Sequence, residues 1–399
     1  MSGPRSALAG PWLHKVPTDW GSTQIRRVAR FRNGADYKPV EVASGGYPVY
    51  GSGGEFRRSS EYLHDGTSVL FGRKGTVDRP LLVHGRFWTV DTMFFTEIGP
   101  QVEPRYFHYY ATTMPFDYYR TSTALPSMTQ EDLSSHVMPL PPLDTQRAIA
   151  DYLDRETTQI DTLIAKQEQL ISRFQERRDA GWAWALTSVA DSAPSTTLRR
   201  MIVSIADGPF GSSLTSAHYS DSGARVIRLG NVGINEFKNE DQAFVPIEYF
   251  RELLAHEARA GDVIIAGLGD DQAPLGRAAV LPEVGPAIVK ADCYRVRPRP
   301  EVDSAYLAWA LSTPQLRHQF SLLARGATRA RLNTAVVQQA VIPLPPLDEQ
   351  RRIVAYLDEQ TAKIDTLIAK AQRFIELAKE RREALITAAV TGQLDVTAA

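Results

Sequence analysis

The sequence has almost no cysteine, no long apolar run and no excess of charge of either sign. The single cysteine among 399 residues, Cys293, cannot form an intramolecular disulfide or a cysteine zinc site, so we expect it to be a small buried apolar residue. Apolar stretches end well before the roughly 18 residues that a transmembrane helix needs. Residues 1–10 also lack the apolar segment of a secretory signal. We therefore expect a cytoplasmic chain.

Charge is balanced, with 45 Lys and Arg against 46 Asp and Glu and a formal net charge of −1. Such a chain is poorly suited to coat nucleic acid unaided, because that binding is driven by neutralisation of phosphates. To bind a polyanion, the chain would need positive charge concentrated on a few loops, or positive charge supplied by a partner subunit. The length and the 43% hydrophobic content fit a globular protein of two or three domains.

Catalytic motifs are also missing from the sequence. It contains no Walker phosphate loop, no G-x-G-x-x-G, no H-E-x-x-H and no G-x-S-x-G. The run Gly51-Ser-Gly-Gly54 resembles a phosphate cradle, but Glu55-Phe-Arg57 follows it instead of a helix start with Lys, so we predict a turn. The eight histidines are scattered, with no pair at metal-ligand spacing. We expect no enzyme activity, no metal and no cofactor in this chain.

An internal repeat dominates what is present. At an offset of 204, residues 139–178 match residues 343–382 at 24 of 40 positions. Both copies begin Pro-Leu-Pro-Pro-Leu-Asp and share the unbroken run Ile-Asp-Thr-Leu-Ile-Ala-Lys. The period is about half the chain, which indicates a tandem of two units rather than a solenoid.

Each copy predicts a long helix with a coiled-coil seam. The Pro-Pro pair favours extended backbone, and Asp144 and Asp348 can cap the first turns of the helices. Gly181 lowers the stability of the first helix, and Gly392 can cap the C-terminus of the second. Apolar residues then alternate in steps of three and four, which favours pairing of the helices with each other, antiparallel. The alternative is two amphipathic helices packed on separate globular cores. The candidate spacer and partner-binding residues are Ile160, Ile164, Ile171, Phe174, Ile364, Ile368, Ile375 and Leu385.

We therefore expect an α+β fold of two similar mixed domains separated by two antiparallel helices, with pseudo-twofold symmetry. The predicted boundaries are a first domain at 1–138, a first helix at 139–187, a second domain at 188–341, and a second helix with a C-terminal tail at 342–399. Strand-like pieces occur at 68–71 and 262–265. Segments 24–28, 66–72 and 121–128 align loosely with 197–201, 261–267 and 325–332, so the framework is shared while the loops differ.

Side chains suited to nucleic acid are concentrated on several predicted loops. Basic clusters lie among aromatic residues in the first domain, and Arg, Gln and Asp, which read base edges in the major groove, lie on two loops of the second. The candidate DNA-binding residues are Arg57, Arg58, Arg73, Lys74, Arg120, Asp271, Gln272, Arg277, Arg325, Arg329 and Arg331. For each residue alone, an ordinary solvated loop remains the alternative.

Several motifs make a family resemblance specific. The helix start P-L-P-P-L-D-x-Q-R-x-I occurs in both copies, beside Asp207-Gly-Pro-Phe-Gly-Ser212, Tyr47-Pro-Val-Tyr-Gly-Ser-Gly-Gly54 and Gly72-Arg-Lys-Gly75. With these motifs, and with its order of domain, helix, domain, helix, the whole chain resembles the DNA specificity subunit of type I restriction-modification enzymes.

The resemblance implies a non-catalytic subunit in which each recognition domain reads one half of a bipartite, asymmetric DNA site. It also implies that the helices dock two modification subunits, which bind S-adenosylmethionine and methylate adenine, and that a restriction subunit uses ATP. Two alternatives stay open: the specificity portion of a self-contained methyltransferase or nuclease, and a coiled-coil adaptor that binds only protein.

Overall fold

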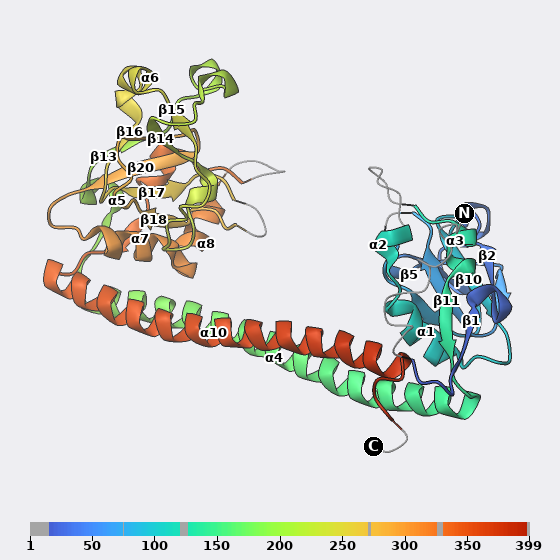
Figure 1. Ribbon diagram of the computed structural model, residues 1–399. Coiled ribbons are helices and arrows are strands. Elements are labelled where there is room, and N and C mark those ends of the chain that lie inside the picture. The colour runs from blue at the N-terminus through green and yellow to red at the C-terminus, as the bar shows by residue number, and fades with distance from the viewer. Residues whose placement is uncertain (1–15, 75, 120–126, 270–272, 325–329, 397–399) are drawn as a thin grey trace. The chain divides into compact units, whose positions relative to one another are not determined.

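The computed structural model describes residues 16–74, 76–119, 127–269, 273–324 and 330–396 (Figure 1). Contacts divide the chain into two units. Unit 1 consists of residues 1–168 and 372–399, and unit 2 of residues 169–371. Each unit therefore contains one globular part and a segment of both long helices.

The long helices are α4 (Leu143–Ser192) and α10 (Leu347–Val390). The other described helices and strands of unit 1 are β1 (Gly21–Gln24), β2 (Ala29–Asn33), β3 (Glu41–Val42), β4 (Tyr47–Gly51), β5 (Gly54–Ser59), β6 (His64–Asp65), β7 (Ser68–Gly72), β8 (Leu81–Val83), β9 (Arg86–Thr89), β10 (Met93–Ile98), α1 (Pro104–Thr112), α2 (Phe116–Tyr119), α3 (Gln130–Ser135) and β11 (Val137–Leu140).

The described helices and strands of unit 2 are β12 (Ser195–Thr197), α5 (Leu198–Met201), β13 (Ile202–Ala206), β14 (Ala224–Ile227), β15 (Phe244–Val245), α6 (Ile247–Glu252), β16 (Glu257–Ala258), β17 (Val263–Ala266), β18 (Ala278–Val280), β19 (Ala287–Val289), β20 (Cys293–Pro298), α7 (Ser304–Ser312), α8 (Pro314–Leu323), α9 (Thr334–Val337) and β21 (Val341–Pro343).

Each unit repeats the same sheet framework. A two-stranded sheet precedes the long helix, β1-β11 in unit 1 and β12-β21 in unit 2. The second sheet of each unit is four-stranded and antiparallel, with the strand order β2-β10-β7-β8 in unit 1 and β13-β20-β17-β18 in unit 2. The third sheets, β3-β5-β4-β9-β6 and β15-β14-β19-β16, both contain one parallel pair, β4 with β9 and β14 with β19. The expected strands at 68–71 and 262–265 are β7 and β17, at equivalent places.

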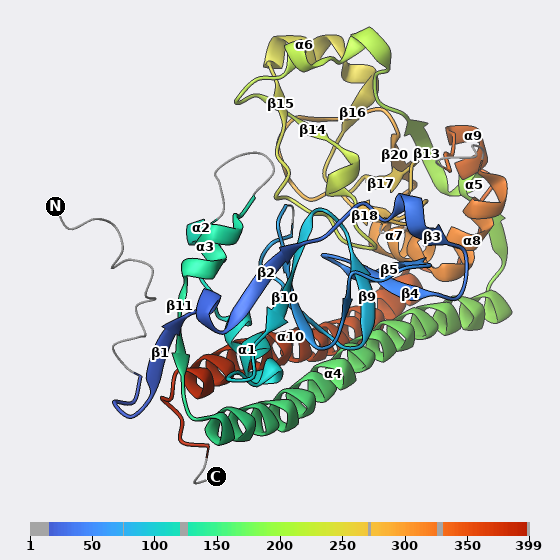
Figure 2. The ribbon, with the colours of Figure 1, turned by 90° about the vertical axis from the view of Figure 1, so that its right-hand side faces the viewer.

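The long helices form part of each unit's core. In unit 1, Ile149 and Leu153 of α4 and Ile386 of α10 join a cluster with the buried aromatics of α1. In unit 2, the corresponding cluster joins Trp182 of α4 and Leu357 of α10 to α7, which lies beside the helix segments in Figure 1. Helix segment and globular part therefore share one core in each unit. Figure 2 shows α1 beside the segments of α4 and α10 that belong to unit 1.

The helix ends confirm one predicted cap and correct two. Gly392 has φ +73°, and Gln393 N donates to Ala388 O at 2.8 Å, the pattern of a glycine C-cap. Asp144 and Asp348 do not cap, because α4 and α10 begin one residue earlier and place both aspartates inside the first turn. A carboxylate there still interacts favourably with the helix dipole.

The two helices run antiparallel within each unit, as predicted. In unit 1, Arg382 Nε lies 3.0 Å from Asp161 Oδ1, and in unit 2, Arg178 Nη1 lies 3.0 Å from Asp365 Oδ1. These are the same two residues of the repeat, used once in each unit. Ile160, Ile164 and Ile368 are buried, and the other five predicted seam residues are partly buried or intermediate. Helix α4 continues through Gly181, which is exposed.

The predicted α+β class, with two domains and two long helices, is confirmed. The four domain boundaries stay a prediction, because the contact units each take in part of both helices. Two smaller predictions hold: Cys293 is fully buried, and Gly51 to Gly54 form the turn between β4 and β5. Within the described ranges, no helix has both the length and the apolarity to cross a membrane.

Candidate nucleic-acid interface

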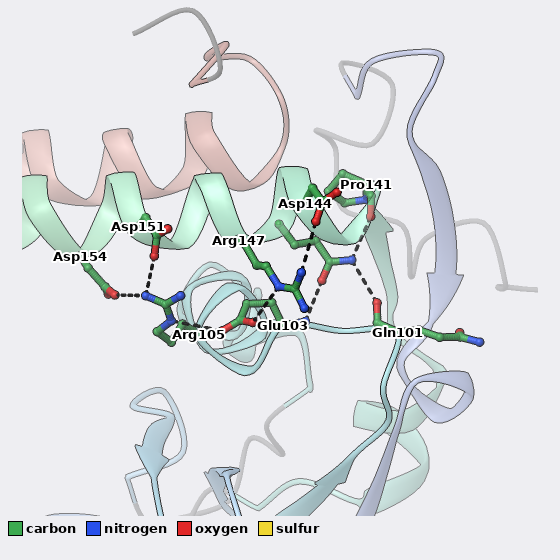
Figure 3. Close-up of polar contacts among 9 residues, drawn as sticks. Gln101, Glu103, Arg105, Pro141, Asp144, Arg147, Asp151 and Asp154 are labelled. Atoms are coloured by element: carbon green, nitrogen blue, oxygen red, sulfur yellow. Dashed lines mark hydrogen bonds and ion pairs between the residues drawn. The ribbon is translucent and has the colours of Figure 1, made fainter.

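A buried glutamine fastens the start of α4 to the globular part of unit 1 (Figure 3). Gln146 Nε2 donates to the carbonyl oxygens of Gln101 at 3.1 Å and Pro141 at 2.8 Å. Its Oε1 accepts a hydrogen bond from Glu103 N at 2.9 Å. The amide thus bonds both to the Pro-Pro segment before α4 and to the turn before α1, which fixes the direction in which the helix leaves the domain.

Unit 2 contains the same contacts around Gln350. Its Nε2 donates to Glu301 O at 3.1 Å and Pro345 O at 2.8 Å, and its Oε1 accepts from Asp303 N at 2.8 Å. Both glutamines are buried. Both are the Gln of the repeated P-L-P-P-L-D-x-Q motif. The sequence analysis did not predict a role for them, although the repetition of this Gln in both copies could have indicated one.

Ion pairs outside the glutamine strengthen the junction of unit 1 (Figure 3). Arg105 on α1 lies 2.8 Å from both Asp151 and Asp154 on α4. Arg147 Nε on α4 lies 4.0 Å from Glu103 Oε2, just before α1. These groups are partly exposed, so each pair contributes little alone, on the order of 0–1 kcal/mol. Among these polar contacts, the buried glutamine therefore contributes most to the attachment.

The structure brings together the two predicted loops of unit 2. Residues 268 and 331 form a β-bridge, and Leu332 N donates to Gly267 O at 2.9 Å. The loop that follows β17 and the loop that precedes α9 are therefore neighbours. Asp271, Gln272, Arg325 and Arg329 lie outside the described residues, so of the predicted contacts on these loops the structure describes Arg277 and Arg331.

Arg331 is exposed and held by two neighbours. Its Nε lies 2.7 Å from Asp292 Oδ1, and its guanidinium carbon lies 5.4 Å from the centroid of the Phe210 ring. Phe210 belongs to the Asp207-Gly-Pro-Phe motif and is 51% exposed. An arginine over an exposed aromatic ring at the edge of two loops is suited to contact a nucleic acid.

Arg277 corrects the sequence-based prediction. Its side chain is buried, at 6% exposure, and its nitrogens donate to the carbonyl oxygens of Val232, Leu229, Leu268, Ala273 and Pro274. The arginine ties the loop after β17 to the neighbouring segment at 229–232. It therefore organises that loop, and we remove it from the candidate DNA contacts.

Unit 1 has an equivalent loop pair. Residues 74 and 127 form a β-bridge, and Met128 N donates to Arg73 O at 3.0 Å. Lys74 is exposed, whereas Arg73 is partly buried, with its guanidinium carbon 5.8 Å from the Phe94 ring centroid. Arg120 lies outside the described residues.

Arg57 and Arg58 lie elsewhere in unit 1, on β5. Arg57 Nε is 3.1 Å from Glu41 and Arg58 Nη2 is 3.1 Å from Glu55. Phe56 between them is 44% exposed. These arginines are accessible, but each has an acidic partner that a phosphate would have to displace. The described residues contain no group of His, Cys, Asp and Glu that could hold a metal ion.

Comparison with known proteins identifies the family. The model of the type I restriction modification DNA specificity domain matches residues 17–173 and 257–376. The chain is 25% identical over 214 residues to the StySPI specificity subunit of Salmonella potsdam and 27% identical over 169 residues to the EcoKI specificity subunit of Escherichia coli. These matches span 43% and 36% of those relatives. The MjaVIII specificity subunit of Methanocaldococcus jannaschii is 20% identical, with 96% of this chain and 94% of the relative covered.

A solved structure shares the fold. It comes from work on complex assembly and conformational transition of the type I restriction-modification system and has a TM-score of 0.64 at 17% identity. The match covers 95% of this chain and 99% of that one. Since the family model matches well over half of the residues, in both units, this chain belongs to the type I restriction-modification DNA specificity family.

Proposed function

We propose that this chain is the DNA specificity subunit of a type I restriction-modification complex, in which each unit reads one half of a bipartite, asymmetric site. The observation that carries the proposal is one framework built twice with different loops. Both units have the same strand order in their two-stranded sheet and in their four-stranded antiparallel sheet, and the same buried glutamine at the helix start. The equivalent loop residues differ, with Ser127 in unit 1 and Arg331 in unit 2.

The two long helices supply a docking surface for partner subunits and set the spacing between the two recognition domains. The proposed partners are two modification subunits that dock along α4 and α10 and methylate adenine with S-adenosylmethionine, and a restriction subunit that uses ATP. Exposed apolar side chains on the helices, Leu163 and Leu170 on α4 and Leu367, Phe374 and Leu377 on α10, favour a protein contact there. The chain itself contributes recognition and no catalysis.

The test is to co-express the chain with its modification subunit and to map methylated adenines across a genome. The proposal expects one motif made of two defined halves separated by a fixed unread gap. Methylation by the isolated chain would support a self-contained methyltransferase instead. Failure of the co-expressed complex to shift any DNA would support a protein-only adaptor.

A further inference from the structure

We propose that Arg331 reads a guanine in the half-site of unit 2, in a pose that Asp292 and Phe210 hold before DNA binds. The inference rests on the proposed function and adds to it a base, a residue and a mechanism. Three features of unit 2 support it: a fixed backbone, a fixed side chain, and a charge balance that suits a base better than a phosphate.

The backbone of Arg331 is attached to the central sheet. Residue 331 bridges Leu268, two residues beyond β17, and Leu332 N donates to Gly267 O at 2.9 Å. The buried Tyr294 of β20 donates its hydroxyl to Leu332 O at 2.5 Å. Although Arg331 adjoins a loop, its main chain is thus part of the framework, and rigid elements position a recognition side chain better than loops do.

The side chain is held as well. Asp292 Oδ1 lies 2.7 Å from Arg331 Nε, and the Phe210 ring lies under the guanidinium. The Arg331 side chain nevertheless keeps 48% of its exposure, whereas that of Asp292 keeps 15%. An arginine immobilised in this way has already lost much of the rotamer freedom that binding would otherwise remove.

A second layer fixes Asp292. Its backbone has φ +69°, which is uncommon for a residue other than glycine, and its N–H donates to Asp207 Oδ1 at 2.9 Å. The same oxygen accepts from Gly208 N at 2.7 Å. Gly208 packs so closely that a Cβ atom there would lie 2.0 Å from the carbonyl carbon of Lys290. The Asp207-Gly-Pro-Phe motif therefore places both groups that hold Arg331.

Charge and geometry point to a guanine. An arginine paired with a carboxylate presents little net charge, so it gains less from a phosphate than a free arginine would. The guanidinium can still donate two parallel N–H groups to O6 and N7 of guanine, the commonest specific contact in the major groove. In unit 1 the equivalent position is Ser127, so this contact belongs to one half-site only.

The experiment compares the parent complex of this chain and its modification subunit with R331K, R331A and D292N complexes. R299A is the matched control. Arg299 is also exposed, but it directly follows β20, whereas Asp292 directly precedes that strand. Binding is measured against oligonucleotides that carry each alternative base pair at each recognised position, at several salt concentrations. A second series uses the parent complex and replaces each guanine of the site in turn with 7-deazaguanine, which lacks N7.

We expect R331K and R331A to lose about 5- to 140-fold of discrimination at one guanine of one half-site, the value of a bidentate contact. D292N should lose less at the same position, and the other half-site should be read as before. The 7-deazaguanine substitution should weaken the parent at that guanine. R299A should leave every base preference unchanged.

Three results would overturn the inference. The first is equal weakening of all sequences by R331A with a smaller salt dependence, which is the behaviour of a phosphate contact. The second is an unchanged base preference in R331K and R331A. The third is a parent complex that tolerates 7-deazaguanine at every position, a result that does not depend on how any variant folds. If the parent itself recognises no bipartite site, the proposed function fails instead.

Discussion

Replacing the buried glutamine at a helix start tests how each unit is built. In Gln146→Met the side chain keeps its approximate volume and loses three hydrogen bonds. Each buried group left unpaired costs about 1–3 kcal/mol, and relaxation recovers part of the total, so we expect a loss of about 2–5 kcal/mol. For a unit of this size that corresponds to a melting temperature lower by about 4–20 °C.

Gln146→Glu makes the test chemically specific. The carboxylate can still accept from Glu103 N, but its second oxygen faces the carbonyl oxygens of Gln101 and Pro141. This repulsion and burial raise the expected pKa of the new carboxyl group in the folded state. The folded state of Gln146→Glu therefore binds a proton at this carboxyl group at a higher pH than the unfolded state does. As a result, the free energy of unfolding of Gln146→Glu, relative to that of Gln146→Met, should rise as pH falls from 7 toward 5.

The assay is thermal unfolding combined with amide hydrogen exchange, which resolves the two units. Gln146→Met should increase exchange in unit 1, Gln350→Met should do so in unit 2, and Gln159→Met on the exposed face of α4 should change neither. If both buried variants unfold within about 0.5 kcal/mol of the parent, the range of ordinary surface substitutions, the glutamines do not hold the helix starts in place.

Three further predictions concern the chain as a whole. Because its net charge is −1, the isolated chain should bind DNA weakly, and the assembled complex should bind tightly with a steep salt dependence; tight specific binding by the chain alone would contradict this. Inserting seven residues after Ile171 and seven after Ala371 preserves the heptad pattern and adds about 10 Å to each helix. The gap between the two recognised half-sites should therefore grow by about three base pairs. An unchanged gap in an active complex would show that the helices do not set the spacing of the recognition domains. Burial lowers the pKa of His136 to about 4, so unit 1 should lose stability as pH falls from about 6.5 toward 4, and His136→Gln should flatten this dependence in acid unfolding.

Local sequence patterns were sufficient for the long helices and for the duplication. These patterns act within a few residues: a seam in steps of three and four, a Pro-Pro pair near the start of each copy, and a glycine at position 392. Helices α4 and α10 and the cap at Gly392 follow from them. The cap predictions at Asp144 and Asp348 were wrong by two residues, because the helices begin at Leu143 and Leu347 and the N-cap positions are Pro142 and Pro346, whose carbonyl oxygens accept the first helical hydrogen bonds. Element boundaries depend on tertiary contacts that propensity does not include.

Burial separated the arginines that sequence reading had grouped together. Arg277 and Arg331 were both predicted to face DNA, yet Arg277 is enclosed by five carbonyl oxygens while Arg331 is exposed above Phe210. Both are arginines on polar, glycine-containing segments, so composition does not distinguish them. The difference arises from which strands pair, and that is a property of the whole unit.

The tandem of two related halves and the two long helices follow from the amino-acid sequence alone, because repeats and heptads are patterns in the order of residues. Which residues meet across long separations depends on the folded structure. It joined Gln146 to the turn before α1, and it placed Asp207, Asp292 and Arg331 around one exposed ring. The physical reason is that helix pairing follows a short local period, whereas a site assembled from three loops depends on sheet order and register, which no single segment encodes.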